Sequence, residues 1–316
     1  MIVSVSRRTD IPAFYADWFF RRLEEGYALV RHPWNPRRVS RVSLTPDAVD
    51  GFVFWTKNPL PMLGRLSRLE PYAYYVHFTL NAYGRDVETG VPSKRDVLIP
   101  AFRTLAERAG RERVIWRYDP IFLSARYTVE YHLRYFEKLA ALLAPCAETC
   151  VISFLDRYRN TERNMASLGL SPFPPSLQAS LAGRLAEIAR ACGLRMEACA
   201  EEADLSSLGV GSARCVDAER LGRLRKRPLS VPRDRRQRAA CGCAESVDIG
   251  AYGSCAHGCR YCYASARRGA LPGGEERDVA SPLLVGHLKK DDVVTERASA
   301  SREDRQGFLP GCGVSS

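Results

Sequence analysis

The chain has 316 residues, of which 46% are hydrophobic, so it is long enough to bury one large core. Its formal net charge is +11 at pH 7, and it contains 11 cysteines. No apolar run is long enough to cross a membrane, and Arg7 and Arg8 stand where a signal peptide would carry its apolar stretch. We therefore expect a cytoplasmic protein without membrane spans. In that reducing compartment, we expect the cysteines to bind metal or to take part in thiol chemistry rather than to form disulfides.

Short apolar runs alternate with longer amphipathic stretches up to residue 200. The predicted strands are Ile2–Ser6, Gly51–Thr56, Ala73–Leu80, Arg113–Tyr118, Cys150–Leu155 and Arg195–Ala200. The predicted helices are Ala13–Glu25, Met62–Leu69, Arg95–Ala109, Val129–Ala144 and Ser176–Cys192. This alternation predicts an α/β fold with a parallel sheet, and we expect residues 1–218 to form a full or partial β/α (TIM-like) barrel. An open, doubly wound sheet is the alternative.

Charged and polar side chains follow the predicted strands at the point where each strand ends. They are Arg7, Arg8 and Asp10 after the first strand, Lys57 and Asn58 after the second, Asn81 after the third, Asp119 after the fourth, Asp156 and Arg157 after the fifth, and Glu201 and Glu202 after the sixth. Because all of these ends open on one face of a β/α barrel, we expect the side chains to meet there. The alternative is that each of them caps a helix or forms a turn.

Two further charged residues, Arg117 and Glu197, lie inside predicted strands. Burying an unpaired charge in an apolar core is costly, so we expect both to face a polar barrel mouth. The candidate catalytic residues, which can orient a substrate or move protons, are Asp10, Lys57, Asp119 and Glu197. The candidate substrate-binding residues, which can bind an anionic group, are Arg7, Arg8 and Arg117.

A basic segment rich in Arg and Pro follows the last predicted strand. Its basic residues are Arg220, Arg223, Arg225, Lys226, Arg227, Arg233, Arg235, Arg236 and Arg238, opposed within that run only by Asp234. We interpret residues 219–240 as a solvated basic linker. A contact with nucleic acid or phosphate is the alternative, because clustered positive charge is the usual footprint of phosphate binding.

Residues 241–288 form a cysteine-rich region, in which Cys255, Cys259 and Cys262 have the spacing CX3CX2C. Three thiolates on one short loop can hold three irons of a [4Fe-4S] cubane and leave the fourth iron open to a small molecule. A structural zinc loop is the alternative, although such sites usually fill all four positions with protein ligands. Residues 289–316 are polar with little periodicity and are predicted to be a flexible tail.

The other cysteines divide into two sets. Cys199, Cys215, Cys241 and Cys243 precede the triad and are candidate ligands of a second iron-sulfur cluster, or else incidental buried cysteines. Cys146, Cys150 and Cys192 lie on apolar helical or strand faces, and we expect them to belong to the core.

Several of these motifs resemble those of the DUF1848 family. The matching stretches are residues 4–14, Phe54–Pro59, Trp116–Ile121, Cys241–Cys243, Val247–Gly250, the triad itself and Ser281–Gly286. The resemblance implies an iron-sulfur protein related to radical-SAM enzymes, which bind S-adenosylmethionine (SAM) at the open iron of the cluster. Tyr261, immediately before the third triad cysteine, matches the position at which those enzymes place an aromatic residue near the adenine of SAM.

Two functions are consistent with these features. The first is an enzyme that reductively cleaves SAM at a [4Fe-4S] cluster and acts on an unknown substrate in the barrel mouth, with an electron donor such as a flavodoxin or ferredoxin. We expect that substrate to be a small molecule rather than a nucleic acid. The second is a non-catalytic iron-sulfur protein for electron transfer or redox sensing, in which Cys241 or Cys243 supplies the fourth ligand.

Overall fold

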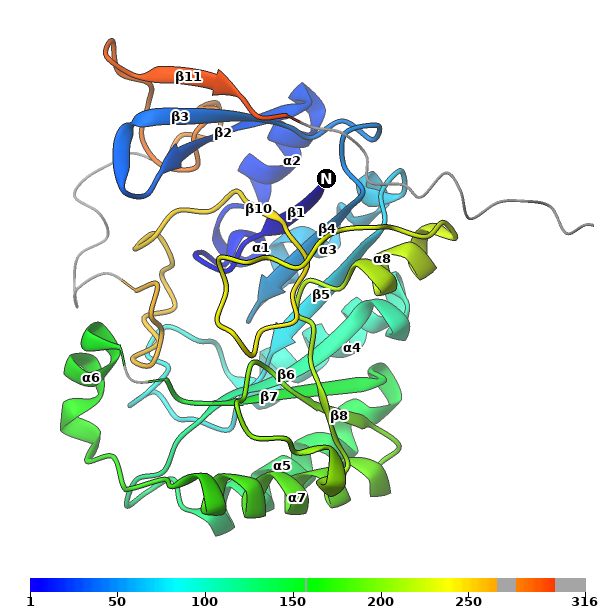
Figure 1. Ribbon diagram of the computed structural model, residues 1–316, viewed down its shortest axis with the longest axis vertical. Coiled ribbons are helices and arrows are strands. Elements are labelled where there is room, and N and C mark those ends of the chain that lie inside the picture. Colours follow the sequence, from blue (N-terminus) through cyan, green and yellow to red (C-terminus); the bar gives the residue numbers. More distant parts are fainter. Residues whose placement is uncertain (157, 266–276, 299–316) are drawn as a thin grey trace, which may run out of the picture.

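The computed structural model describes residues 1–156, 158–265 and 277–298 (Figure 1). Its main sheet has eight strands in the order β10-β1-β4-β5-β6-β7-β8-β9, and every neighbouring pair is parallel. The strands are β1 (Ile2–Val5), β4 (Gly51–Thr56), β5 (Tyr74–Thr79), β6 (Val114–Ile121), β7 (Thr149–Phe154), β8 (Arg195–Ala198), β9 (Val210–Ser212) and β10 (Val247–Asp248). All six predicted strands are therefore present.

The main sheet is open, so the closed form of the predicted barrel is wrong. The edge strands β9 and β10 do not pair with each other within the described residues. These strands have only three and two residues, and the chain between them lies over one face of the sheet instead of extending it. The α/β class and the parallel sheet are confirmed.

Apolar side chains on both faces of the sheet explain why the strands form near-continuous hydrophobic runs. On one face, Phe52, Phe54 and Val76 belong to the large core that the helices cover. On the other face, Val53 and Tyr75 belong to a second core. Residues 213–244 complete this second core, on the face that a closed barrel would turn inward.

The helices that connect the strands include a counterpart of each predicted one, but the predicted Ala13–Glu25 is interrupted at Tyr15, and only Met62 and Leu63 of the predicted Met62–Leu69 are α-helical. The helices are α1 (Ile11–Phe14), α2 (Ala16–Glu25), α3 (Leu60–Leu63), α4 (Ile99–Ala109), α5 (Val129–Leu143), α6 (Arg159–Met165), α7 (Pro175–Ala191) and α8 (Ala218–Arg225). Side-chain caps fix several of the starts: Asp10 caps α1, and Thr128 caps α5 by accepting from the backbone N–H of Tyr131. Helices α6 and α8 are not predicted from the sequence.

A small second sheet lies beside α2 at one end of the molecule (Figure 1). It consists of the antiparallel pair β2 (Tyr27–His32) and β3 (Asn35–Ser43), with β11 (Val293–Glu296) parallel to β3. None of these strands is predicted, and β11 lies inside the segment predicted to be a flexible tail. Residues 299–316 of that segment are outside the described residues.

The predicted basic linker is attached to the rest of the protein by its arginines. Helix α8 occupies its first residues, and the buried Arg220 donates to the carbonyl of Glu112 at 3.1 Å. Arg233 donates to the backbone carbonyls of Ala239 and Cys241. Arg220 is buried, whereas Arg233 and most of the other basic side chains of the segment are exposed to solvent. In the described part of the chain, no helix has the length and apolar character needed to cross a bilayer.

Candidate functional site

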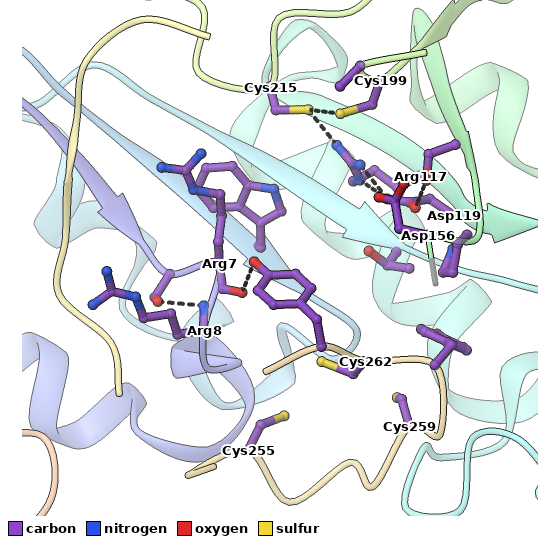
Figure 2. Close-up of a pocket in the computed structure, with 18 of the residues that line it drawn as sticks. Arg7, Arg8, Arg117, Asp119, Asp156, Cys199, Cys215, Cys255, Cys259 and Cys262 are labelled. Atoms are coloured by element: carbon purple, nitrogen blue, oxygen red, sulfur yellow. Dashed lines mark hydrogen bonds and ion pairs between the residues drawn. The ribbon is translucent and has the colours of Figure 1, made fainter. Parts of the chain in front are cut away.

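A cavity of about 590 Å³ lies at the carboxyl ends of the main-sheet strands (Figure 2). Its lining includes residues at or just after six strands: Arg7, Lys57, Thr79, Asp119, Phe154 and Cys199. Both cysteine groups contribute to the same lining, the triad Cys255, Cys259 and Cys262 and the second group Cys199, Cys215, Cys241 and Cys243. The strand-end residues meet, as the sequence predicts, and the triad joins them in the same cavity.

The triad loop is attached to the chain segments that follow β1 and β5. The backbone N–H of Arg260 donates to the carbonyl of Val87 at 3.0 Å, and that of Gly90 donates to the carbonyl of His257 at 2.8 Å. On the other side, the hydroxyl of Tyr15 donates to the carbonyl of Ser254 at 2.9 Å. Two glycines permit this approach: Gly258 has a φ of +62°, and a Cβ on Gly90 would lie 2.7 Å from a backbone oxygen of the loop.

The three triad side chains face a common space in the cavity (Figure 2). Burial raises the pKa of the Cys255 thiol to about 12 and also raises the pKa of Cys259, which is fully buried. Buried thiols of this kind become thiolates only when a positive group such as iron compensates the charge. Within the described residues, no group of three or more His, Cys, Asp or Glu side chains could hold a single metal ion. A cubane makes a different demand, because each thiolate binds its own corner iron, and the donor set of the loop fits such a cluster.

Asp10, a predicted catalytic residue, joins four parts of the site. Its carboxylate accepts from the Thr56 hydroxyl at 2.7 Å, from the backbone N–H of Lys57 at 2.7 Å and from the N–H of Ala13 at 3.0 Å. His257 Nε2 lies 2.7 Å from the same carboxylate. Asp10 therefore positions the triad loop against the ends of β1 and β4.

His257, between the first two triad cysteines, is buried and ordered by this contact. Its ring packs edge-on against Phe14, with the ring centres 4.6 Å apart. Its Nδ1 is buried without a hydrogen-bond partner among the described residues, so it is available to a polar group of a bound molecule.

Lys57, also a predicted catalytic residue, forms an ion pair with Glu88 at 2.8 Å. Glu88 is fully buried and pairs with Lys94 at 2.8 Å through its other oxygen. Burial alone would raise the pKa of Glu88, but the two ammonium groups outweigh it and lower that pKa to about 2. Lys57 thus neutralises a buried carboxylate and is not free to bind an anionic substrate.

Tyr261, the predicted SAM contact, has its ring in the cavity lining and its hydroxyl in the same buried network. The hydroxyl donates to Glu88 and accepts from the side-chain amide of Asn81 at 3.1 Å. The ammonium of Lys57 lies 5.5 Å from the centre of the ring. These contacts fix the orientation of Tyr261 while one surface of its ring remains at the cavity.

Arg117 and Asp119 form a buried ion pair at the end of β6. Asp119 also accepts from the hydroxyl of Ser153 on β7, and Arg117 Nη1 donates to the sulfur of Cys215 at 3.0 Å. Arg117 already has a carboxylate partner, so it is not a free cation for a substrate. Instead, it links the second cysteine group to Asp119.

The second cysteine group lines the cavity away from the triad, and Figure 2 shows Cys199 and Cys215 separated from the triad loop. The sulfurs of Cys199 and Cys215 are 3.1 Å apart. Hydrogen bonds from Cys199 and Cys243 lower the pKa of Cys215 well below its ordinary value, and a hydrogen bond with Cys243 lowers that of Cys241 to about 6. The four thiols therefore influence one another directly.

Arg7 and Arg8 also line the cavity. The guanidinium of Arg7 lies 5.8 Å from the ring centre of Trp55, and that of Arg8 lies 5.0 Å from the ring centre of Tyr252. Within the described part of the chain, neither guanidinium forms an ion pair with a carboxylate. Arg236 also lines the cavity without an ion pair to a carboxylate among the described residues, so these three arginines are the cations of the lining that remain available for an anionic group.

Glu197, the fourth predicted catalytic residue, does not line the cavity. It lies in the middle of β8, paired in register with Val151 of β7, where its side chain contacts Gly211 of β9. Burial raises the pKa of Glu197, opposed by the charge of Arg220. Through Val151, Glu197 is level with the cavity residue Arg117 in the sheet, but it lies next to the edge strand β9, beyond the part of the sheet that the cavity covers.

The comparisons with known proteins agree with the resemblance stated for the sequence. The family model described as a domain of unknown function (DUF1848) matches residues 2–264. The chain belongs to this family. No curated protein matches the chain. The matched residues include the whole triad, the second cysteine group and every strand of the main sheet. All residues that line the cavity of this DUF1848 member except Ser265 therefore belong to the family domain.

Two further residues of this DUF1848 site have no clear signal in the sequence. Glu88 follows β5 by nine residues, in a loop with no predicted element. Asp248 on β10 accepts from Ser4 at 2.9 Å, from Ser6 and from the backbone N–H of Arg7 at 2.8 Å, so it positions the substrate-binding candidates. Its place in a matching stretch, Val247–Gly250, is the only signal that could have identified it.

Proposed function

We propose that this protein is an iron-sulfur enzyme that holds a [4Fe-4S] cluster at Cys255, Cys259 and Cys262 and uses it to cleave SAM reductively. One observation carries the proposal: the three thiols of the triad loop line the same cavity as the charged residues at the strand ends. A reactive site needs both in one place, because a cluster remote from polar groups would have no substrate to act on.

When bound, such a cluster supplies the electron that cleaves the sulfonium bond of SAM, and its open iron supplies an anchoring point for that molecule. The chain supplies the surroundings. The Tyr261 ring offers an apolar surface for an adenine, and the network of Glu88 and Asn81 holds that ring in place. Asp10 and His257 hold the triad loop against the sheet.

Arg7 and Arg8 are the residues that we propose to bind an anionic group of the substrate or the carboxylate of SAM. Both residues line the cavity, and neither guanidinium has a carboxylate partner among the described residues, so binding an anion does not require an existing ion pair to break. Asp156 is the candidate for proton exchange. Burial raises its pKa, against the opposing charge of Arg238, toward the range in which a carboxylic acid can take up or release a proton.

The substrate that we propose is a small molecule. The cavity volume of about 590 Å³ lies in the range typical of small-molecule pockets. Several arginines of the basic segment are also used within the protein: Arg220 and Arg233 bind backbone carbonyls, and Arg238 pairs with Asp156. That leaves fewer free guanidinium groups for phosphate contacts than the sequence suggests.

The test is anaerobic reconstitution with iron and sulfide, followed by dithionite reduction with and without SAM. We expect a reduced cluster whose EPR signal changes on addition of SAM, and formation of 5′-deoxyadenosine. The variant Cys255→Ser/Cys259→Ser/Cys262→Ser should show neither effect. The matched control is Cys146→Ser/Cys192→Ser, because these half-buried thiols pack against the core outside the cavity lining.

A signal that is unchanged by SAM, with no 5′-deoxyadenosine, would instead favour the second candidate, a non-catalytic electron-transfer or redox-sensing protein. The observation in favour of that candidate is that four further thiols line the same cavity, from which Cys241 or Cys243 could provide a fourth ligand. In that case Cys241→Ser or Cys243→Ser should make the cluster responsive to SAM by opening one iron.

A further inference from the structure

Four thiols of the cavity have no role in SAM cleavage as proposed. Cys199 follows β8, Cys215 follows β9, and Cys241 and Cys243 precede β10. Three of them, Cys215, Cys241 and Cys243, are between 2% and 7% exposed. Buried cysteines are common in cores, but these four line a cavity at the polar edge of the sheet, together with charged side chains.

The four thiols fall into two pairs. The sulfurs of Cys199 and Cys215 lie 3.1 Å apart, and Cys241 and Cys243 are separated by one residue on the segment that lines the same cavity. In a tetrahedral site for one zinc ion, all four sulfurs would converge on a single point. Within the described residues, no three or more His, Cys, Asp or Glu side chains converge in this way. A cluster needs less convergence, because the close pair Cys199 and Cys215 can bind one iron while Cys241 and Cys243 bind another.

The environment of these sulfurs contains N–H donors. Arg117 Nη1 donates to the sulfur of Cys215 at 3.0 Å, and the backbone N–H of Val216 donates to the sulfur of Cys243 at 3.4 Å. The guanidinium of Arg7 faces the same part of the cavity. Clusters with four thiolate ligands are anionic, and N–H groups directed at their sulfurs stabilise that charge and adjust the reduction potential.

We infer that Cys199, Cys215, Cys241 and Cys243 together ligate a second iron-sulfur cluster, on the same cavity as the triad but fully coordinated by protein. The site is independent of SAM chemistry, although any role as an electron relay to the triad rests on the proposed function. Because protein thiolates fill every position, this cluster has no open iron and should not respond to SAM.

The test counts iron and acid-labile sulfide after anaerobic reconstitution of the full chain. A single cubane contains four irons, so the parent protein should hold clearly more than about four per chain. The variant Cys199→Ser/Cys215→Ser/Cys241→Ser/Cys243→Ser should lose that excess and keep the SAM-responsive EPR signal. The triad variant should do the reverse, keeping the excess iron without a response to SAM.

The results for the two variants distinguish the second cluster from the proposed function. If the triad variant loses the response to SAM but holds as much iron as the parent, only the proposed function is overturned. Equal iron content in the parent and the four-cysteine variant would overturn the second cluster only, as would stoichiometric zinc or a Cys199–Cys215 disulfide in the reconstituted parent. Circular dichroism must show that the variants are folded. If the four-cysteine variant does not fold, ⁵⁷Fe Mössbauer spectra of the parent decide: two sets of iron signals support the second cluster, and one set overturns it.

Discussion

Glu88 is the residue on which most of the buried charge of the site depends. It is fully buried, pairs with Lys57 and Lys94, and accepts a hydrogen bond from Tyr261. Removing one member of a buried ion pair leaves the others charged and without compensation, which typically costs several kcal/mol. Glu88 therefore holds the two lysines and the tyrosine in place. It contacts the proposed cluster ligands only through the backbone of the loop.

The first prediction concerns Glu88→Gln and its pH dependence. The pKa of Glu88 is about 2 in the folded protein and 4.5 without interactions, so the carboxylate stabilises the fold fully above pH 4.5 and progressively less as the pH falls toward 2. At pH 7, Glu88→Gln should lower the free energy of unfolding by roughly 3 kcal/mol. Urea denaturation of both proteins from pH 7 to pH 3 measures it.

The difference between the parent and Glu88→Gln should shrink as the pH falls below 4.5. Comparing the two proteins removes the effect of the buried histidines, since His77 and His132 have pKa values lowered to about 4 by burial and are present in both. Asp86→Asn is the matched control, because Asp86 is only half-buried in the same loop. A difference that is the same at every pH would show that the pKa of Glu88 does not change on folding.

Sequence reasoning locates the site residues that stand directly after strands, such as Asp10 and Asp119. The reason is physical: a parallel sheet brings all of its carboxyl ends to one edge. Glu88 and His257 are missed because their positions depend on how two loops pack against each other. The same limitation explains Lys57, whose position is predicted but whose charge is already neutralised by Glu88.

At the scale of elements, the contact between β10 and β1 determines the geometry of one cavity wall. Val3 and Ser4 pair with Val247 and Asp248, and Gly250 follows within two residues. A Cβ on Gly250 would lie 2.1 Å from the hydroxyl oxygen and 2.6 Å from the Cβ of Ser6. Ser6 has little freedom to move away, because its hydroxyl donates to Asp248 and accepts from the backbone of Arg8.

The second prediction is that Gly250→Ala destabilises the protein by about 1–3 kcal/mol, the range for forced overpacking of a close contact. Gly64→Ala is the control, because a Cβ there meets nothing within 4 Å and the backbone has an ordinary φ of −65°. Thermal unfolding measures both. Equal midpoints for the two variants would mean that β1 and β10 are not closely packed.

The strands that the sequence identifies are long apolar runs such as Gly51–Thr56, which burial on both faces makes recognisable. Those it misses lack that signal. β10 has two residues and β9 has three, which is too short for any periodicity. β11 is exposed along its whole length and depends on pairing with β3, which is distant in the sequence. An open sheet and a closed barrel also share the same strand-helix alternation, so the pattern could not distinguish them.

At the scale of the whole molecule, the cavity brings together residues from Ser6 to Ser265. The cysteines that we propose as ligands belong to the later part of the chain, whereas most of the polar lining comes from earlier strands. A cofactor bound to several of these segments at once would stabilise the folded state relative to the unfolded chain, because the complete ligand set exists only in the folded state.

The third prediction is that reconstitution with iron and sulfide raises the thermal unfolding midpoint by several degrees, since each kcal/mol shifts the midpoint of a protein of this size by a few degrees at most. The unfolding midpoint of the variant Cys255→Ser/Cys259→Ser/Cys262→Ser should rise less than that of the parent. The midpoint of Cys146→Ser/Cys192→Ser should rise as much as that of the parent. Anaerobic calorimetry provides the measurement. An identical gain in the triad variant would place the stabilising metal elsewhere.

The pairing of β10 with β1 also determines when the protein can acquire a metal centre. During synthesis, β1 is made long before its partner β10 and the triad loop, which emerge only after residue 246. A nascent chain that stops short of this point has no wall on that side of the cavity and none of the three triad thiols. Under the proposed function, the cell's cluster-assembly machinery must therefore deliver its cargo to a chain whose family domain is already complete. A message truncated just upstream of Cys255 would yield a polypeptide that carries the substrate-binding arginines but has no triad site to load.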